Sequence, residues 1–139
     1  MTLLNGTKGR AAVGLLAMAL VLTACNNQGP AYSLPAPLYA AVIDMTTTLD
    51  FSPDKVTIKA GDVVLWRNQT AFTHTVTGDP SQLADPSRIT LPDGAEPFGS
   101  GPIPPGEVFA YKFETPGIYR YVCKPHKNFD MAGTIIVTP

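Results

Sequence analysis

Proline and glycine interrupt this chain at short intervals, which limits it to short segments of regular structure. The 139 residues include 14 prolines and 12 glycines. Both residue types favour turns and disfavour the interior of long helices. The length is that of one ordinary domain, and no window keeps a helical period for more than two turns. We therefore expect an all-β domain of short strands joined by frequent turns.

Alternating apolar and polar residues predict where these strands lie. The clearest alternation is in "DKVTIKAGDVVLWRN", on both sides of its "AGD" turn, and in "VFAYKFET". We assign Trp66 and Phe113 to the core, because aromatic residues in alternating strands usually pack inside. Two further strands are expected at Tyr119–Cys123 and Gly133–Val137. Strands at this spacing predict a β-sandwich.

A long connection separates the two halves of the pattern. Gly78–Glu107 contains seven prolines and is longer than an ordinary loop, with room for one short helical turn or edge strand. Its acidic residues stand mostly beside proline or glycine, where turn chemistry explains them better than acid–base catalysis does. We expect these acids to be solvated; they are Asp79, Asp85, Asp93 and Glu96.

The N-terminus has the pattern of a bacterial secretion signal. Lys8 and Arg10 precede twelve apolar or small residues, Ala11–Leu22, too few to span a membrane. The "LTAC" that ends at Cys25 resembles a lipobox, in which the cysteine becomes the acylated N-terminus. Two acyl chains suffice for stable anchoring to a membrane. The alternative is an ordinary secretory signal with Cys25 incidental.

This pattern divides the chain into three parts. We expect a lipoprotein signal peptide at residues 1–24, a lipidated N-terminus and proline-containing flexible linker at 25–38, and a folded domain at 39–139. Removal of the signal leaves eight basic and eleven acidic residues, so the charge changes from −1 to −3. Neither value suits a nucleic-acid-binding protein. Cys123 then remains as a lone thiol that cannot form an internal disulfide.

Sulfur and imidazole ligands are concentrated in "YVCKPHKNFDM" near the C-terminus. Cys123, His126 and Met131 lie within nine residues after an expected strand, and the chain has one other histidine, His74. Two imidazoles, a thiolate and a weak thioether are the ligand set of a blue-copper site. Zinc would accept the cysteine and histidines, but the thioether would add little. Taken singly, each of the four residues could instead be an ordinary core or loop residue.

The segment "YVCKPHKNFDMAGTIIV" resembles the C-terminal copper loop of cupredoxins, the family of plastocyanin, pseudoazurin and amicyanin. Its Cys-x2-His-x4-Met spacing is the plastocyanin and pseudoazurin length. "VTIKAGDVVLWRNQTAFTHTVT" and "FGSGPIPPGEVFAYKFETPGIYRYVC" are similar to other parts of the same fold. The resemblance implies an eight-stranded Greek-key sandwich with one type 1 copper ion. The implied ligands are His74, Cys123, His126 and Met131.

Two positions depart from the family pattern. Thr75 stands where plastocyanin and amicyanin usually have an asparagine that ties the ligand loops together. Val122 stands before the cysteine, where plastocyanin commonly has tyrosine. No subfamily is therefore assigned.

Four protein ligands leave no open position for a substrate, so we expect one-electron transfer rather than catalysis. The partners would be a redox protein donor and acceptor, near the membrane that holds the lipid, and the protein would be a monomer. The family's exposed ligand histidine implies docking around His126, with Phe72 as a further candidate. The nearby candidates are Pro125, Phe129, Lys124 and Lys127.

Two other functions use the same residues. An extracytoplasmic copper carrier or buffer would have the same ligands but exchange the metal readily. A methionine- or histidine-rich segment would favour it, and the only methionines after the signal are Met45 and Met131. A copper oxidase or nitrite reductase subunit would need a second copper site, for which no histidines remain.

Overall fold

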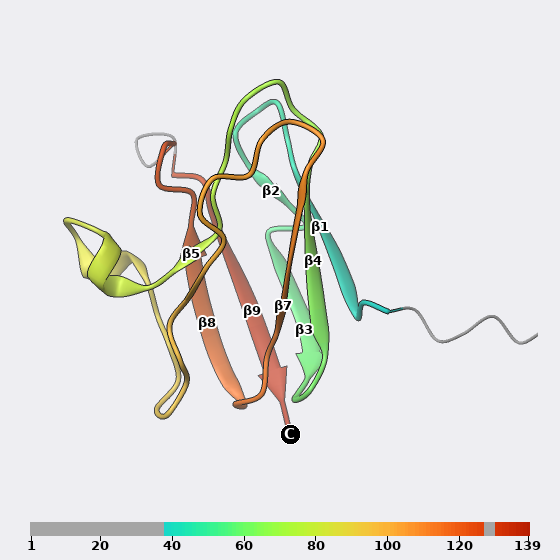
Figure 1. Ribbon diagram of the computed structural model, residues 1–139. Coiled ribbons are helices and arrows are strands. Elements are labelled where there is room, and N and C mark those ends of the chain that lie inside the picture. The colour runs from blue at the N-terminus through green and yellow to red at the C-terminus, as the bar shows by residue number, and fades with distance from the viewer. Residues whose placement is uncertain (1–37, 127–129) are drawn as a thin grey trace, which may run out of the picture. The chain divides into compact units, whose positions relative to one another are not determined.

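The computed structural model describes residues 38–126 and 130–139, whose strands form two sheets (Figure 1). One sheet has the order β2-β1-β4-β7, made of Phe51–Ser52, Ala41–Met45, Val63–Asn68 and Val108–Lys112. The other has the order β3-β9-β8-β5-β6, made of Lys55–Lys59, Ala132–Thr138, Gly117–Val122, Thr77–Gly78 and Phe98–Gly99. The predicted all-β sandwich is confirmed.

The strand count differs from the eight that the resemblance implied. Nine strands are present in the described residues, and β2, β5 and β6 have only two residues each. β2 pairs with β1, β5 pairs with β8, and β6 pairs with β5. Segments of two residues are too short to show an alternation in the sequence. Among the described residues, no helix is long and apolar enough to cross a membrane.

The alternation in the long strands separates core from surface as expected. In β4, Val64 and Trp66 are fully buried, whereas Arg67 between Trp66 and Asn68 is exposed. Phe113, immediately after β7, is also fully buried, so the assignment of Trp66 and Phe113 to the core is confirmed. The expected strands around Tyr119–Cys123 and Gly133–Val137 correspond to β8 and β9.

Tyr121 lies at the centre of the core. Its hydroxyl accepts a hydrogen bond of 3.0 Å from Trp66 Nε1, and its ring packs edge-on against Phe51. Gly133 on the neighbouring strand leaves room for this ring, because a Cβ atom there would overlap it. The core therefore combines close ring packing with a satisfied indole N–H.

The long connection projects from the sandwich as a separate excursion (yellow in Figure 1). It contains two 3-10 turns, η1 at Pro80–Gln82 and η2 at Pro86–Arg88, before the edge strand β6. Asp79 and Asp85 cap these turns through their carboxylates, which accept from the N–H groups of Ser81 and Ser87. The carboxylates of this excursion thus include two that serve turn formation, as expected.

Candidate metal centre

Strand pairing explains why distant ligands meet. Thr77 of β5 is opposite Val122, the last residue of β8, in an antiparallel pair. Residues just before Thr77 therefore lie beside residues just after Val122, which brings His74 to Cys123 across 49 positions of sequence. A bridge between His74 and Ile103 fixes the histidine backbone, with N–H···O distances of 3.1 and 2.8 Å.

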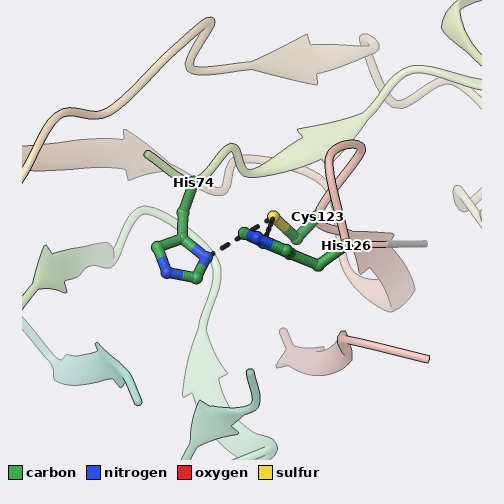
Figure 2. A group of neighbouring side chains, drawn as sticks. All are labelled: His74, Cys123 and His126. Carbon is green, nitrogen blue, oxygen red and sulfur yellow. Dashed lines mark hydrogen bonds between the residues drawn. The ribbon is translucent and has the colours of Figure 1, made fainter. Parts of the chain in front are cut away.

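Three potential ligand atoms converge on one point. Cys123 Sγ lies 3.6 Å from His74 Nδ1 and 3.4 Å from His126 Nδ1 (Figure 2). The candidate ligand atoms of the three residues all lie within 4.8 Å of one another. His74 and Cys123 are fully buried, and His126 is half-buried. Of the four predicted ligands, the structure thus brings these three together.

These distances fit a bound metal ion. Metal–sulfur and metal–nitrogen bonds of about 2.3 and 2.0 Å at a near-tetrahedral angle separate the two ligand atoms by about 3.5 Å. The observed Sγ–Nδ1 distances are close to that value. A soft thiolate with two imidazoles suits copper rather than a hard cation. Only modest rearrangement of the three side chains would accompany binding.

Met131 lies at the far end of the loop that begins at Cys123. It is completely buried, and its backbone carbonyl accepts a hydrogen bond of 2.9 Å from Cys123 N–H. Asp130, just before it, adopts the left-handed conformation that short polar residues tolerate in turns. The loop is therefore closed at its base by the backbone.

The long excursion holds this loop on both sides. Lys124 Nζ donates to Gln82 Oε1 at 3.2 Å, and Arg88 forms an ion pair of 2.7 Å with Asp130. Gln82 in turn donates to Asp79. The sequence did not indicate these contacts, because exposed side chains of two loops carry no periodic signal.

Thr75 connects the two ligand segments. Its N–H donates to Cys123 Sγ at 3.4 Å, and its hydroxyl accepts from Lys124 N–H at 2.9 Å. The Thr75 hydroxyl also lies 3.2 Å from that of Thr77. The threonine thus makes the inter-loop hydrogen bond that the departure from asparagine had put in doubt.

In the metal-free site, burial favours the neutral forms of the Cys123 and His74 side chains. It raises the pKa of Cys123, which the hydrogen bond from Thr75 N–H opposes. Burial lowers the pKa of His74, and the neighbouring His126 acts in the same direction. A metal cation reverses this balance at the sulfur, since coordination holds a thiol as thiolate.

Asn68 and Thr70 also support the site, although they were not among the residues expected from the sequence. Thr70 Oγ1 lies 3.0 Å from His74 Nε2, and Asn68 Oδ1 lies 2.8 Å from the same hydroxyl. Both residues are almost completely buried. A signal was available, because Asn68 takes the inward position after Val64 and Trp66 in the alternation of β4.

The predicted docking residues are only partly described. Lys124 and Pro125 are exposed, and so is the Phe72 side chain, at 54%. Lys127 and Phe129 lie outside the described residues, as do Cys25 and the expected signal peptide.

A two-sheet β-sandwich with a Cys–His–His cluster at one end of its strands is the arrangement expected of a cupredoxin. A profile of the family "Copper binding proteins, plastocyanin/azurin family" matches residues 39–138. The chain therefore belongs to this copper-binding family, and the predicted cofactor, copper, is confirmed. Cupredoxins of this kind typically transfer electrons to redox partners through the metal.

Individual comparisons agree. Plastocyanin of Scenedesmus fuscus is 36% identical over 89 residues, covering 64% of this chain and 87% of the relative. A reduced Cu(I) amicyanin variant superimposes with a TM-score of 0.56 at 24% identity, covering 71% of this chain and 82% of that one, and supports the fold. A copper-containing nitrite reductase from Thermus scotoductus matches at 25% identity and a TM-score of 0.58. That match covers 75% of this chain but only 23% of the enzyme.

Proposed function

We propose that this protein is a one-electron carrier whose type 1 copper is held by His74, Cys123, His126 and Met131. The observation that carries the proposal is the convergence of two imidazole nitrogens on one buried sulfur, at 3.6 and 3.4 Å. Copper would supply a reversible Cu(II)/Cu(I) couple at this point. The chain would supply ligands held in place before the metal binds.

Hydrogen bonds of the loop bases support this role. Cys123 N–H donates to Met131 O, which joins the two ends of the ligand loop, and Lys124 N–H donates to the Thr75 hydroxyl, which ties the start of that loop to the His74 segment. Ligands held in this way move little when the charge at the site changes. With four protein ligands there is no open position for a substrate, so we propose a carrier rather than an enzyme.

The half-buried His126 suggests where electrons would enter and leave. Exposed Phe72 and Pro125 would offer apolar contact to a redox donor or acceptor, and Lys124 would favour an acidic or neutral partner. We include Phe129 and Lys127 in this docking surface from their positions in the sequence.

We further propose an extracytoplasmic, lipid-anchored monomer in a bacterium. Residues 1–24 would be the signal peptide, Cys25 the lipidated residue, and 25–38 a linker to the domain at 39–139. The support is the charged, apolar and "LTAC" succession in the sequence. Replacing Cys25 with alanine should release the protein from membranes, and continued membrane association would count against the anchor.

Copper titration tests the site. The soluble domain from Asn26 to Pro139 is titrated with copper(II) and followed by visible absorption and electron paramagnetic resonance. An intense blue band with a narrow hyperfine splitting is expected, and Cys123→Ser should abolish it. A wild-type complex that is colourless would mean that Cys123 is not a ligand, and the copper carrier or buffer would then become the better explanation.

A further inference from the structure

The imidazole of His74 makes a different contact on each side. Nδ1 lies 3.6 Å from Cys123 Sγ, and Nε2 points away from the sulfur (Figure 2). Nε2 lies 3.0 Å from Thr70 Oγ1. A neutral imidazole carries its proton on one nitrogen and a lone pair on the other. Only the nitrogen without the proton can bind a metal. If His74 Nε2–H donates to the Thr70 hydroxyl, Nδ1 is unprotonated and can bind a metal; if the hydroxyl donates to Nε2, Nδ1 carries the proton and cannot.

Asn68 has a fixed amide orientation. Its Nδ2 lies 2.7 Å from the carbonyl oxygen of Phe72 and 2.8 Å from that of Ile103. Both oxygens can only accept, so the NH₂ group must face them. The Oδ1 atom of Asn68 is consequently an acceptor directed at Thr70, where it receives the backbone N–H at 3.0 Å.

The Thr70 hydroxyl has one proton to donate, and its other neighbours settle where that proton goes. Asn68 Oδ1 at 2.8 Å and the Phe72 carbonyl at 3.2 Å can only accept from it. Phe72 N–H donates to the hydroxyl oxygen at 3.1 Å. The shortest contact takes the proton to Asn68. The hydroxyl oxygen is then left with a lone pair toward His74 Nε2 and must accept there.

We propose that Thr70, oriented by Asn68, is a positioning residue that holds His74 as its Nε2–H tautomer, with Nδ1 unprotonated toward Cys123. The proposal rests on the proposed metal site and adds the device that prepares one ligand before metal arrives. The Thr70 hydroxyl, itself held by the Asn68 amide, also fixes the rotation of the His74 ring. Among the described contacts, it is the acceptor that His74 Nε2–H reaches.

The tautomer can be measured without metal. The ¹⁵N-labelled apoprotein is studied near pH 8, above the ordinary pKa of imidazole, by long-range ¹H–¹⁵N correlation NMR. The chain has two histidines, so a His126→Gln variant assigns the ring signals of His74. We expect a protonated Nε2 and an unprotonated Nδ1 in the wild type. An Nδ1–H tautomer in the wild type would overturn the proposal, whether or not any variant folds.

Variants separate positioning from general stability. Thr70→Val keeps the shape and removes the hydroxyl, so His74 should lose its uniform tautomer and copper affinity should fall about tenfold. Thr70→Ser should restore both. Thr138→Val is the matched control, because that hydroxyl binds the Ile58 carbonyl at the opposite end of β9 from Met131. It should leave His74 unchanged.

The outcomes distinguish this proposal from the proposed function. A Thr70→Val protein with the wild-type tautomer and copper affinity would overturn the positioning role. A wild type with the Nε2–H tautomer, restored in Thr70→Ser, but no blue copper complex would uphold the role of Thr70 and contradict the proposed electron-transfer site.

Discussion

The inward-facing side chains change from aromatic residues to potential hydrogen-bonding or metal-binding residues within two positions of β4, and again at the end of β8. At Trp66 and Tyr121 the inward side chains are aromatic. Two positions farther along each chain segment, the inward residues are Asn68 and Cys123. All four are at most 1% exposed, so the difference is one of chemistry and not of burial.

The aromatic region, which we define as Phe51, Trp66, Phe113 and Tyr121, consists of ring contacts around the hydrogen bond from Trp66 Nε1 to the Tyr121 hydroxyl. Tyr121 packs edge-on against Trp66 with ring centroids 5.4 Å apart, and Phe113 lies 6.3 Å from Trp66. Such contacts contribute mainly through the apolar surface removed from water. Loss of a ring here therefore lowers the free energy of unfolding of the whole domain.

The ligand region is held by directed polar contacts. Asn68, Thr70, His74, Thr75 and Thr77 are buried, and every buried side-chain nitrogen or oxygen in the described residues has a hydrogen-bond partner. Satisfied groups of this kind add little net stability but fix orientation. The aromatic region therefore governs whether the chain folds, and the ligand region governs what the folded domain can bind.

Truncation of Trp66 should give the largest effect. Trp66→Ala removes a fully buried ring and leaves the Tyr121 hydroxyl without its partner, so we expect the free energy of unfolding to fall by about 3–5 kcal/mol. Urea unfolding of the apoprotein measures it. His126→Gln, at the half-buried ligand end, should change apoprotein stability by less than about 1 kcal/mol. Equal losses of stability in the two variants would show that both regions contribute equally to folding.

Gly133 tests how tightly the aromatic region is packed. Gly133→Ala would drive a Cβ atom into the Tyr121 ring, and overpacking of this kind costs about 1–3 kcal/mol. Gly99→Ala is the matched control, because the nearest atom to its new Cβ is 3.6 Å away, an ordinary contact. Thermal unfolding of both variants should show a loss only for Gly133→Ala. A stable Gly133→Ala protein would mean that the ring has room to move.

The strands and the ligand types could be predicted because each has a local signature. Alternation with a period of two predicts β3, β4 and β7, and the rarity of cysteine and histidine draws attention to Cys123 and His126. Pairing of β5 with β8, which brings His74 to them, depends on contacts between distant segments. Only the family resemblance supplied that part.

Most of the supporting hydrogen bonds could not be predicted. The family resemblance drew attention to Thr75, but Thr70 is one of several threonines in a β-branched stretch, and nothing in the sequence separates it from threonines that do not contact a metal ligand. The roles of both residues follow from the positions of His74 and Cys123, which the fold sets. The same applies to the two turns η1 and η2, whose contacts with the ligand loop are between side chains on the surface.

Two hydroxyl deletions, one in each region, separate stability from metal retention. Tyr121→Phe removes the acceptor of Trp66 Nε1–H, and Thr75→Val removes the acceptor of Lys124 N–H, so each should cost about 1–3 kcal/mol. Only Thr75→Val should speed copper release to a chelator, roughly tenfold. Its blue band should persist, because the N–H that reaches Cys123 Sγ is backbone.

Thr75→Ser is the control for that pair. It keeps the hydroxyl and should release copper at the wild-type rate. Faster release from Tyr121→Phe, at a rate similar to that of Thr75→Val, would show that the aromatic region also holds the ligands, and the division between the two regions would fail.

The exposed turns should show the smallest effect. The Ser81 hydroxyl and the Gln82 amide lower the pKa of Asp79, and the Ser87 hydroxyl and N–H lower that of Asp85. A carboxyl whose pKa is lower in the folded state stabilises the fold above its unfolded pKa, about 4, and this contribution is lost as pH falls through the lowered value. Both side chains face solvent, so the loss on acidification should be slight.

Carboxyl titration by NMR separates the two turns. Ser87→Ala should raise the pKa of Asp85 toward its ordinary value and leave Asp79 unchanged, because Asp79 depends on Ser81 and Gln82 instead. Since Gln82 also binds Lys124, the Asp79 turn is the one connected to the ligand loop. Ser81→Ala should therefore affect copper release more than Ser87→Ala does, although far less than Thr75→Val. The reverse order would place the support of that loop in η2, through Arg88 and Asp130, rather than in η1.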